Sequence, residues 1–448
     1  MAGDGGVCLG SSAKAFKRAR IAMATRLPPF SAALLVWSFG AALYLIGFFQ
    51  RVAPAVITTE LMGEFGLTAA ALGNLSALYF YTYVAMQIPT GVLVDHFGPR
   101  RVLTAGAALA CVATLLFSLS SGFGLVATGR LAIGASVAVA FVSMLKLAAH
   151  WASPSRFAML SGLALACGVI GGVTAGVPLR LAVDGFGWRN VMLGVGIATG
   201  VLAVFTWWVV RDDPRERGYS GFAEGDSRVR PVHTMLGGIR EVLRYPNVWF
   251  SFVACGAITG PVLAFGGLWG VPFLVTHYGM STANAAFVTS VLLVAWAVGG
   301  PIVGALSDRL QRRKAPIAVG GIVATILWCV VIWVPGLPYP VLLAVLALIG
   351  LASAVIIIGF AFVKESAPAT LAGTASGIAN MGNMLGGMVM QPVIGRILDA
   401  SGSGSVDHGV RIYELSAYQA GFGFMLVWLG LGTVAVFFSR ETRCRQIA

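Results

Sequence analysis

Residues 91–101 read GVLVDHFGPRR, and residues 304–314 read GALSDRLQRRK. Five positions of the first segment recur in the second with one offset of 213 residues, four with the same residue and the fifth as lysine in place of arginine. Each segment follows one long apolar run and precedes another, so each forms a short polar turn between two helices. A single offset for five positions indicates that the chain consists of two related halves.

The composition is too apolar for a water-soluble protein. Of the 448 residues, 58% are hydrophobic and only 10% are charged, and the mean hydropathy is +0.86. Runs of about 20 apolar residues are long enough to cross a bilayer as helices. Twelve such runs are predicted, near 31–58, 70–94, 102–122, 123–151, 157–182, 189–211, 247–276, 283–307, 315–335, 339–363, 369–397 and 416–438. The predicted fold is therefore an all-α membrane protein of two six-helix bundles.

The basic residues indicate the orientation of the chain in the membrane. The net charge is +13, and 24 of the 30 Lys and Arg fall in the two terminal segments and the even-numbered loops. The positive-inside rule assigns that side to the cytoplasm. Both termini are then cytoplasmic, and the basicity reflects topology, with no nucleic-acid partner.

The same pattern divides the chain into five segments. They are a basic tail (1–30), an N-terminal bundle (31–211), a cytoplasmic linker (212–246), a C-terminal bundle (247–438) and a cytoplasmic tail (439–448). A short surface helix is predicted in the linker over 234–244. Met23 is an alternative start. Six scattered cysteines form no metal-ligand or disulfide pattern.

The polar turn at 91–101 carries a specific chemistry. Gly91 and Gly98 permit close helix approach and a tight turn, Asp95 can cap a helix or pair with a base, and Arg100 and Arg101 can bind helix C-termini. This pattern resembles the loop 2–3 signature of the major facilitator superfamily. The second copy resembles the weaker echo of that signature in loop 8–9, through Gly304, Asp308 and Arg313. The resemblance implies alternating access, with these eight residues acting in gating.

Further segments are similar to a narrower group within that superfamily. They look most like bacterial members near the anion:cation symporters and the intraphagosomal amino-acid transporters. This narrower resemblance rests on Arg51-Val-Ala-Pro54, Phe141–Trp151, Leu268–Pro272 and Gly373–Asp399. The segments Gly129–Gly134 and Gly187–Arg189 resemble further signatures of the superfamily as a whole.

Two charges lie well inside predicted spans, Arg51 in the first and Arg130 in the fourth. Charges inside lipid are costly and indicate a functional site. Each arginine lies roughly 10 Å below the outer edge at 1.5 Å per residue, so both can converge on one anion. The resemblance likewise implies substrate-carboxylate and gating roles. The alternative is that both snorkel outward or bond helix carbonyls.

The chain departs from the symporters at two positions. That group usually has an aspartate before the first arginine and a glutamate seven residues after the second, and these carry the proton. Here Gln50 and Val137 stand in those places. Proton coupling through this pair is not expected, which opens a facilitator or an exchanger as alternatives.

Polar residues at helical spacing predict the rest of a binding site. Tyr79, Tyr83 and Gln87 share one face of the second span, and Asn380, Asn383 and Gln391 lie along the eleventh. Such groups either orient a solute or hold helices together by hydrogen bonds. Trp269 is a further candidate, with packing as its alternative.

These observations predict a secondary transporter for a small carboxylate-bearing solute, such as an amino acid, short peptide or organic acid. Symport or facilitated transport is expected, and a proton-driven exporter or a transporter-like sensor is the alternative. The expected partners are the solute, a co-transported proton or other ion, and the lipid bilayer. We expect a monomer in the bacterial inner (plasma) membrane, with no cofactor. No hydrolase motif or nucleotide-binding loop occurs, so an enzyme is not predicted.

Overall fold

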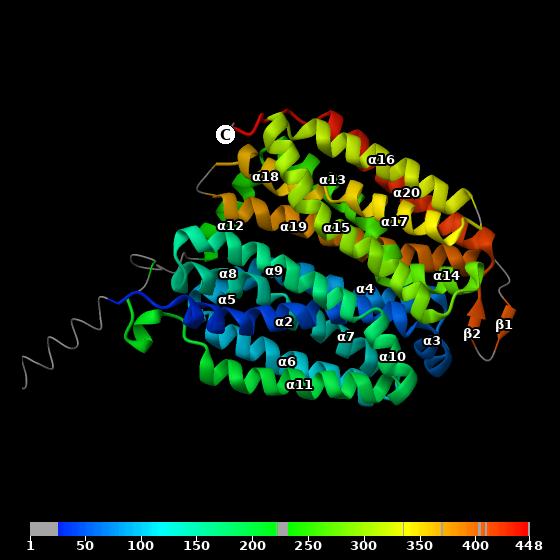
Figure 1. Cartoon of the computed structure of the whole chain (residues 1–448), viewed down its shortest axis with the longest axis horizontal. Coiled ribbons are helices and arrows are strands. Elements are labelled where there is room, and N and C mark those ends of the chain that lie inside the picture. Colours follow the sequence, from blue (N-terminus) through cyan, green and yellow to red (C-terminus); the bar gives the residue numbers. More distant parts are fainter. Residues whose placement is uncertain are drawn as a thin grey trace, which may run out of the picture.

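The computed structural model describes residues 26–220, 222, 232–334, 336–368, 371–401, 405–407 and 410–446. Its helices run along one long axis in two groups, and α2–α11 form the group drawn in the lower part of Figure 1. The helices of this first group are α2 (Phe30–Val56), α3 (Thr58–Phe65), α4 (Ala69–Ala85), α5 (Gln87–Phe97), α6 (Pro99–Leu119), α7 (Phe123–Val137), α8 (Val139–Trp151), α9 (Pro154–Thr174), α10 (Val177–Phe186) and α11 (Trp188–Val209).

The second group follows a short 3₁₀ helix, η1 (Pro214–Arg217), and the helix α12 (Val232–Val242). Its helices are α13 (Pro246–Ala264), η2 (Phe265–Trp269), α14 (Gly270–Tyr278), α15 (Thr282–Leu310), α16 (Lys314–Trp333), α17 (Tyr339–Ser353), α18 (Ile356–Ser366), α19 (Ala372–Ala400) and α20 (Leu415–Phe437). The helix expected over 234–244 is thus present as α12.

The described helices include ten segments that are long and apolar enough to cross a membrane. The bent pair α4 and α5 makes an eleventh if it is counted as one span. The helix α19 is 29 residues long and runs beside them (Figure 1), but its polar side chains include Asn380, Asn383 and Gln391. The boundaries lie within a few residues of the predicted ones because hydrocarbon thickness limits the apolar length.

Several spans are interrupted where a proline removes a backbone hydrogen bond. The ring of a proline clashes with the carbonyl four residues earlier. Pro89 therefore explains the break at Met86, three residues earlier, where α4 and α5 meet at 50°. Pro178 matches the end of α9 at Thr174, and Pro272 follows the π-helical turn η2.

The expectation of an all-α chain needs one correction. Within the loop expected between 401 and 414, β1 (Ser405–Asp407) and β2 (Val410–Ile412) form a two-stranded antiparallel sheet. Val406 is paired with Arg411 at its centre. An exposed loop permits this local pairing, whereas a membrane-spanning segment does not.

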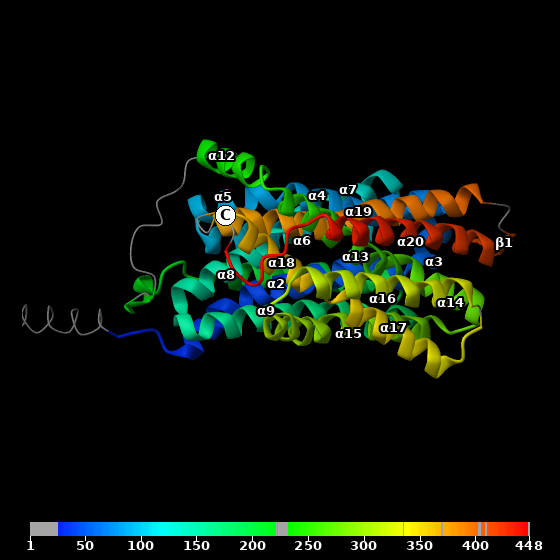
Figure 2. The ribbon, with the colours of Figure 1, turned by 90° about the horizontal axis from the view of Figure 1, so that it is seen from above.

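The two ends of the molecule differ. The start of the described chain, α12 and the C-terminus lie at one end, and α3 and the β1–β2 hairpin lie at the other (Figures 1 and 2). We call them the terminal end and the hairpin end. The two groups of helices meet along α4 and α19, α2 and η2, and α9 and α15.

Candidate functional site

Arg51 lies in the last two turns of α2 and is only 2% exposed. Its guanidinium carbon is 4.1 Å from the ring centre of Phe48, 5.2 Å from that of Tyr83 and 5.5 Å from that of Tyr79. The ring of Phe80 follows at 5.8 Å. Arg51 therefore lies in a box of aromatic rings, which we call the aromatic box.

The box does not neutralise the charge of Arg51. Among the described residues, no carboxylate forms an ion pair with Arg51, and its Nε has no hydrogen-bond partner. The Tyr79 side chain is within hydrogen-bonding reach, while its own hydroxyl donates to the carbonyl of Gly47 at 3.0 Å. Each cation–π contact is worth about 0.5–2 kcal/mol. Removing an ion from water costs several kcal/mol, so Arg51 remains an uncompensated cation.

Helical spacing explains why these side chains meet. Tyr44, Phe48 and Arg51 are separated by four and three residues, so they share one face of α2. Tyr79 and Tyr83 stack on α4 with ring centres 5.8 Å apart. At Gly134 a Cβ would lie 2.1 Å from the Tyr79 carbonyl oxygen, so only glycine lets α7 approach α4 this closely.

Arg130 is bound differently. Its Nη1 donates to the carbonyl of Gln50 at 2.7 Å, and its Nη2 donates to that of Ser76 at 3.3 Å. It is 1% exposed, and its guanidinium carbon is 5.4 Å from the centre of the Tyr79 ring. Both arginines thus contact Tyr79, but Arg130 links α7 to α2 and α4. This geometry favours the alternative of carbonyl binding for Arg130.

Neutral side chains occupy the two positions where a carboxylate would be expected. Gln50 donates from Nε2 to the Thr114 hydroxyl at 2.9 Å. A Cβ placed on Gly47 would lie 3.0 Å from the Cβ of Val137, so Val137 packs against Gly47. The carbonyl of Gly47 also accepts the hydrogen bond from the Tyr79 hydroxyl. Neither supplies a negative charge to Arg51 or Arg130.

The second group of helices contributes polar groups from α19. Asn380 donates to the Gln87 side chain at 2.9 Å, which is a hydrogen bond between the two groups of helices. Asn383 is buried, and its Oδ1 has no partner. A Cβ at Gly387 would contact the Phe80 ring at 3.0 Å, so this face of α19 borders the aromatic box.

Trp269 has a structural contact. It is buried in η2 and donates from Nε1 to the backbone carbonyl of Gln391 at 3.0 Å. Gln391 in turn donates to the carbonyl of Leu263, while its own Oε1 has no partner. The packing alternative therefore describes Trp269 in this conformation.

The structure brings most of the predicted site residues together. Both arginines contact the ring of Tyr79, and Arg51 also contacts that of Tyr83. Gln87, four residues after Tyr83, accepts a hydrogen bond from Asn380. The sequence analysis missed Tyr44, Phe48 and Phe80. Tyr44 and Phe48 could have been found because they lie seven and three residues before Arg51, on its own helical face.

The predicted gating residues lie at the terminal end of the molecule. Asp95 pairs with Lys146 at 2.8 Å, and Arg100 donates to the carbonyl of Trp207 at the end of α11. The Arg100 backbone N–H donates to Asp212, whose pKa is raised by burial. Gly98 has a φ of +81° and lies against Asp212, so no other residue fits there without strain. Gly91 is half-buried and Arg101 is exposed.

The second copy of the motif forms an equivalent network. Arg313 pairs with Asp308 at 2.6 Å and with Glu365 at 2.7 Å. Burial opposes its charge, but these two hydrogen-bonded carboxylates raise the pKa of Arg313. Glu441 accepts from the backbone N–H groups of Arg313 and Lys314, as Asp212 does from Arg100. A Cβ placed on Gly304 would meet Ile357 at 3.8 Å, an ordinary contact distance, so space does not restrict this position to glycine.

A further cluster at the hairpin end joins the two groups of helices. Asp399, at the end of α19, accepts from the backbone N–H groups of Ala69 and Ala70 at 3.2 and 2.8 Å. Tyr413 donates to Asp399 at 2.5 Å and accepts from Ala69 at 2.9 Å. A carboxylate at a helix N-terminus is stabilised by the unpaired N–H groups and the helix dipole. We call this cluster the Asp399 latch.

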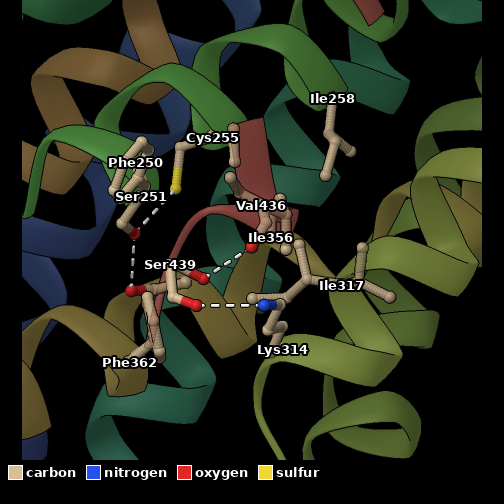
Figure 3. A pocket seen from close by; sticks show the side chains of 13 residues that line it. Phe250, Ser251, Cys255, Ile258, Lys314, Ile317, Ile356, Phe362, Val436 and Ser439 are labelled. Atoms are coloured by element: carbon tan, nitrogen blue, oxygen red, sulfur yellow. Dashed lines mark hydrogen bonds between the residues drawn. The ribbon is translucent and has the colours of Figure 1, made fainter. Parts of the chain in front are cut away.

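A separate narrow pocket lies inside the second group of helices (Figure 3). It is enclosed by α13, α16, α18 and α20, and its volume of about 10 Å³ holds no more than one water molecule. Ser251 bonds Cys255 and the Gly359 carbonyl on one wall, and Lys314 bonds Ser439 on another. It is too small to bind a transported solute, and none of its lining residues belongs to the aromatic box.

Comparisons with known proteins agree with this architecture. The model of the Major Facilitator Superfamily matches residues 30–391 and 263–444. A crystal structure of a bacterial homolog of the human lysosomal transporter Spinster, in an inward-facing and unoccupied conformation, has a TM-score of 0.70 at 19% identity. It covers 91% of this chain and 96% of that one.

Two sequence relatives cover most of the chain. A probable galactarate/D-glucarate transporter of Escherichia coli (strain K12) is 24% identical over 79% of this chain and 84% of its own length. A probable sulfoacetate transporter of Cupriavidus necator is 24% identical over 81% of this chain and 86% of its own. The chain belongs to the Major Facilitator Superfamily and is a multi-pass membrane transporter rather than an enzyme.

Proposed function

We propose that this protein is a secondary transporter of small organic anions and that Arg51 binds the carboxylate of the solute. The observation that carries the proposal is the uncompensated charge of Arg51 inside the aromatic box. An anion at this place supplies the missing counter-charge, and a guanidinium binds a carboxylate with two parallel hydrogen bonds. The aromatic rings supply the apolar walls that exclude water from the pair.

The names of the relatives favour an organic acid as the solute over an amino acid or a short peptide. Those two relatives are named as transporters of galactarate/D-glucarate and of sulfoacetate. All three compounds are small acids that are negatively charged at neutral pH. Sugar diacids also carry hydroxyl groups, which need neutral hydrogen-bonding partners. Asn383, with its unpartnered Oδ1, and the Gln87–Asn380 pair are suited to that role.

The position of the aromatic box supports alternating access. Arg51 lies on α2, which η2 of the second group contacts, and Phe80 touches α19. The box is thus at the boundary between the two groups of helices, where relative movement exposes it to either side. We infer twelve spans, with α19 as the least apolar, and bundles over 31–211 and 247–438.

The Asp399 latch closes one side of that boundary. With both termini in the cytoplasm, the latch lies on the outer side of a bacterial plasma membrane, and the conformation described is closed to the outside. The networks around Asp95 and Arg313 lie on the cytoplasmic side. We assign them to gating because they hold loop 2–3 and loop 8–9 to α11 and α20.

A thermal-shift assay of the detergent-purified protein tests the anion site. D-glucarate, galactarate, sulfoacetate and L-glutamate are added to the native protein, to Arg51→Gln and to the matched control Arg240→Gln, which changes an exposed arginine of α12. An anion at 100 times its Kd stabilises by about 2.7 kcal/mol by mass action. We expect at least one anion to raise the unfolding temperature of the native protein and the control, but not of Arg51→Gln.

The opposite result identifies the alternative function. Stabilisation by a lipophilic cation such as tetraphenylphosphonium, retained in Arg51→Gln and accompanied by no effect of any anion, contradicts the proposal. Arg51 would then be structural, and export of cationic or neutral compounds would explain the protein better.

A further inference from the structure

The charge balance of the transmembrane interior suggests how transport is coupled. Of the 17 acidic residues of the chain, each described one lies in a loop, in the β1–β2 hairpin, in one of the short helices α3, η1 and α12, or within the last turns of a span. Those nearest the membrane interior pair with bases at their own level, as Asp95 does with Lys146 and Glu365 with Arg313. The interior around the aromatic box therefore holds Arg51 and Arg130 with no negative charge.

The two neutral positions beside these arginines strengthen this point. The Gln50 amide nitrogen donates to Thr114, its Oε1 is a neutral acceptor without a partner, and Val137 packs against Gly47. Arg130 is at least bound by two carbonyls, which are dipoles with partial negative charge. Among the described residues, Arg51 is contacted by ring faces and the Tyr79 side chain.

The consequence concerns the two reorientation steps of a transport cycle. In each step the site passes through an occluded state, where water cannot solvate it. With an anion bound, Arg51 is paired and the occluded site is neutral at that position. Without an anion, the same step buries an unpaired cation, and cation–π contacts offset only part of that cost.

We propose that the protein works as an anion exchanger, in which the loaded carrier reorients much faster than the empty one. The inference rests on the proposed anion function and adds its coupling mode. The substrate on one side is exchanged for a second carboxylate-bearing anion on the other, and no proton is required. Net movement of an anion without exchange is slow because it requires the empty carrier to return.

An efflux assay in proteoliposomes tests the proposal. Vesicles are loaded with radiolabelled D-glucarate, galactarate or sulfoacetate and diluted into buffer with or without the same unlabelled anion. Valinomycin and equal potassium on both sides remove any limit set by membrane potential. We expect the external anion to accelerate efflux by at least about tenfold, equally at pH 6 and pH 8.

A carboxylate placed beside the arginines tests the physical cause. Gln50→Glu supplies an internal counter-ion, so we expect net efflux into anion-free buffer to rise toward the exchange rate. Gln50→Leu is the matched control, because it also removes the hydrogen bond to Thr114 but adds no charge. The ratio of exchange to net efflux in this control stays as in the native protein.

Three results overturn the proposal in distinguishable ways. Equal net efflux and exchange in the native protein show that the empty carrier returns freely, and the exchange mode is then wrong while the anion function stands. An unchanged ratio in Gln50→Glu shows that charge does not cause the slow return. If none of the three anions moves under any condition, the anion function fails and the exchange mode fails with it.

Discussion

Arg51 and Arg130 are both buried arginines within transmembrane helices, and their surroundings give them different roles. Arg130 donates to two backbone carbonyls on two other helices. Arg51 faces aromatic rings, and none of the described backbone carbonyls accepts a hydrogen bond from it; the Nε of each arginine is without a partner. We interpret the first as a structural link between helices and propose that the second retains its charge for a ligand.

This difference predicts opposite effects on stability. Arg130→Met leaves the carbonyls of Gln50 and Ser76 without these donors, and we expect a loss of about 1–3 kcal/mol. Arg51→Met replaces an uncompensated buried cation by an apolar side chain of similar length, so we expect equal or higher stability. The measurement is thermal unfolding without anion, in one detergent and at one scan rate. An Arg51→Met protein that is less stable than Arg130→Met would contradict the assignment.

The sequence was sufficient to find both arginines but not to separate their roles. A charge inside an apolar run is visible in any hydropathy pattern. Which carbonyls face a guanidinium depends on how α7 packs against α2 and α4, and that packing is not encoded in local spacing. The bond between Gln87 and Asn380, 293 positions apart, was likewise out of reach.

At the scale of single helices, the Asp399 latch is the clearest contact between the ends of two helices. Asp399 was expected to be an acid at the end of a span, and its contact with the N-terminus of α4 was not foreseen. The latch joins the α4 N-terminus to the C-terminus of α19 through Asp399 and Tyr413. Loss of an N-terminal carboxylate cap costs about 0.5–2 kcal/mol.

We therefore expect Asp399→Asn to open the hairpin end of the molecule. Spin labels at Ser121 and Tyr339, in a variant with all six cysteines replaced by serine, report the separation of the two groups by pulsed electron resonance. Asp399→Asn should increase the population at longer distance. Glu414→Gln is the control, since it removes a nearby exposed charge that caps no helix through its side chain. No difference between the two variants would show that the latch does not hold this end closed.

For the whole molecule, the apolar pattern predicted the helices and their boundaries because bilayer thickness dictates the length of a span. The repeat at 91–101 and 304–314 indicated the two halves. The breaks at Met86, at Thr174 and at η2 lie beside prolines but were not predicted. The β1–β2 hairpin was missed because three-residue strands leave no periodic signal.

The orientation of the whole chain is a further prediction. Both described ends lie at one end of the molecule, opposite the hairpin (Figure 1). In a cysteine-free background, an impermeant maleimide should label Glu414→Cys in intact cells but Arg312→Cys only after permeabilisation. Both residues are exposed, so accessibility to solvent does not limit the reaction. The reverse pattern would place the Asp399 latch on the cytoplasmic side.

The central claim is that the molecule moves a small organic anion by binding it at Arg51. Uptake of radiolabelled D-glucarate, galactarate or sulfoacetate into proteoliposomes preloaded with the same unlabelled anion tests it most directly. Native protein and the exposed-site control Arg240→Gln should accumulate label, while Arg51→Gln should stay at the level of protein-free vesicles. Equal uptake by Arg51→Gln and the native protein would contradict the account.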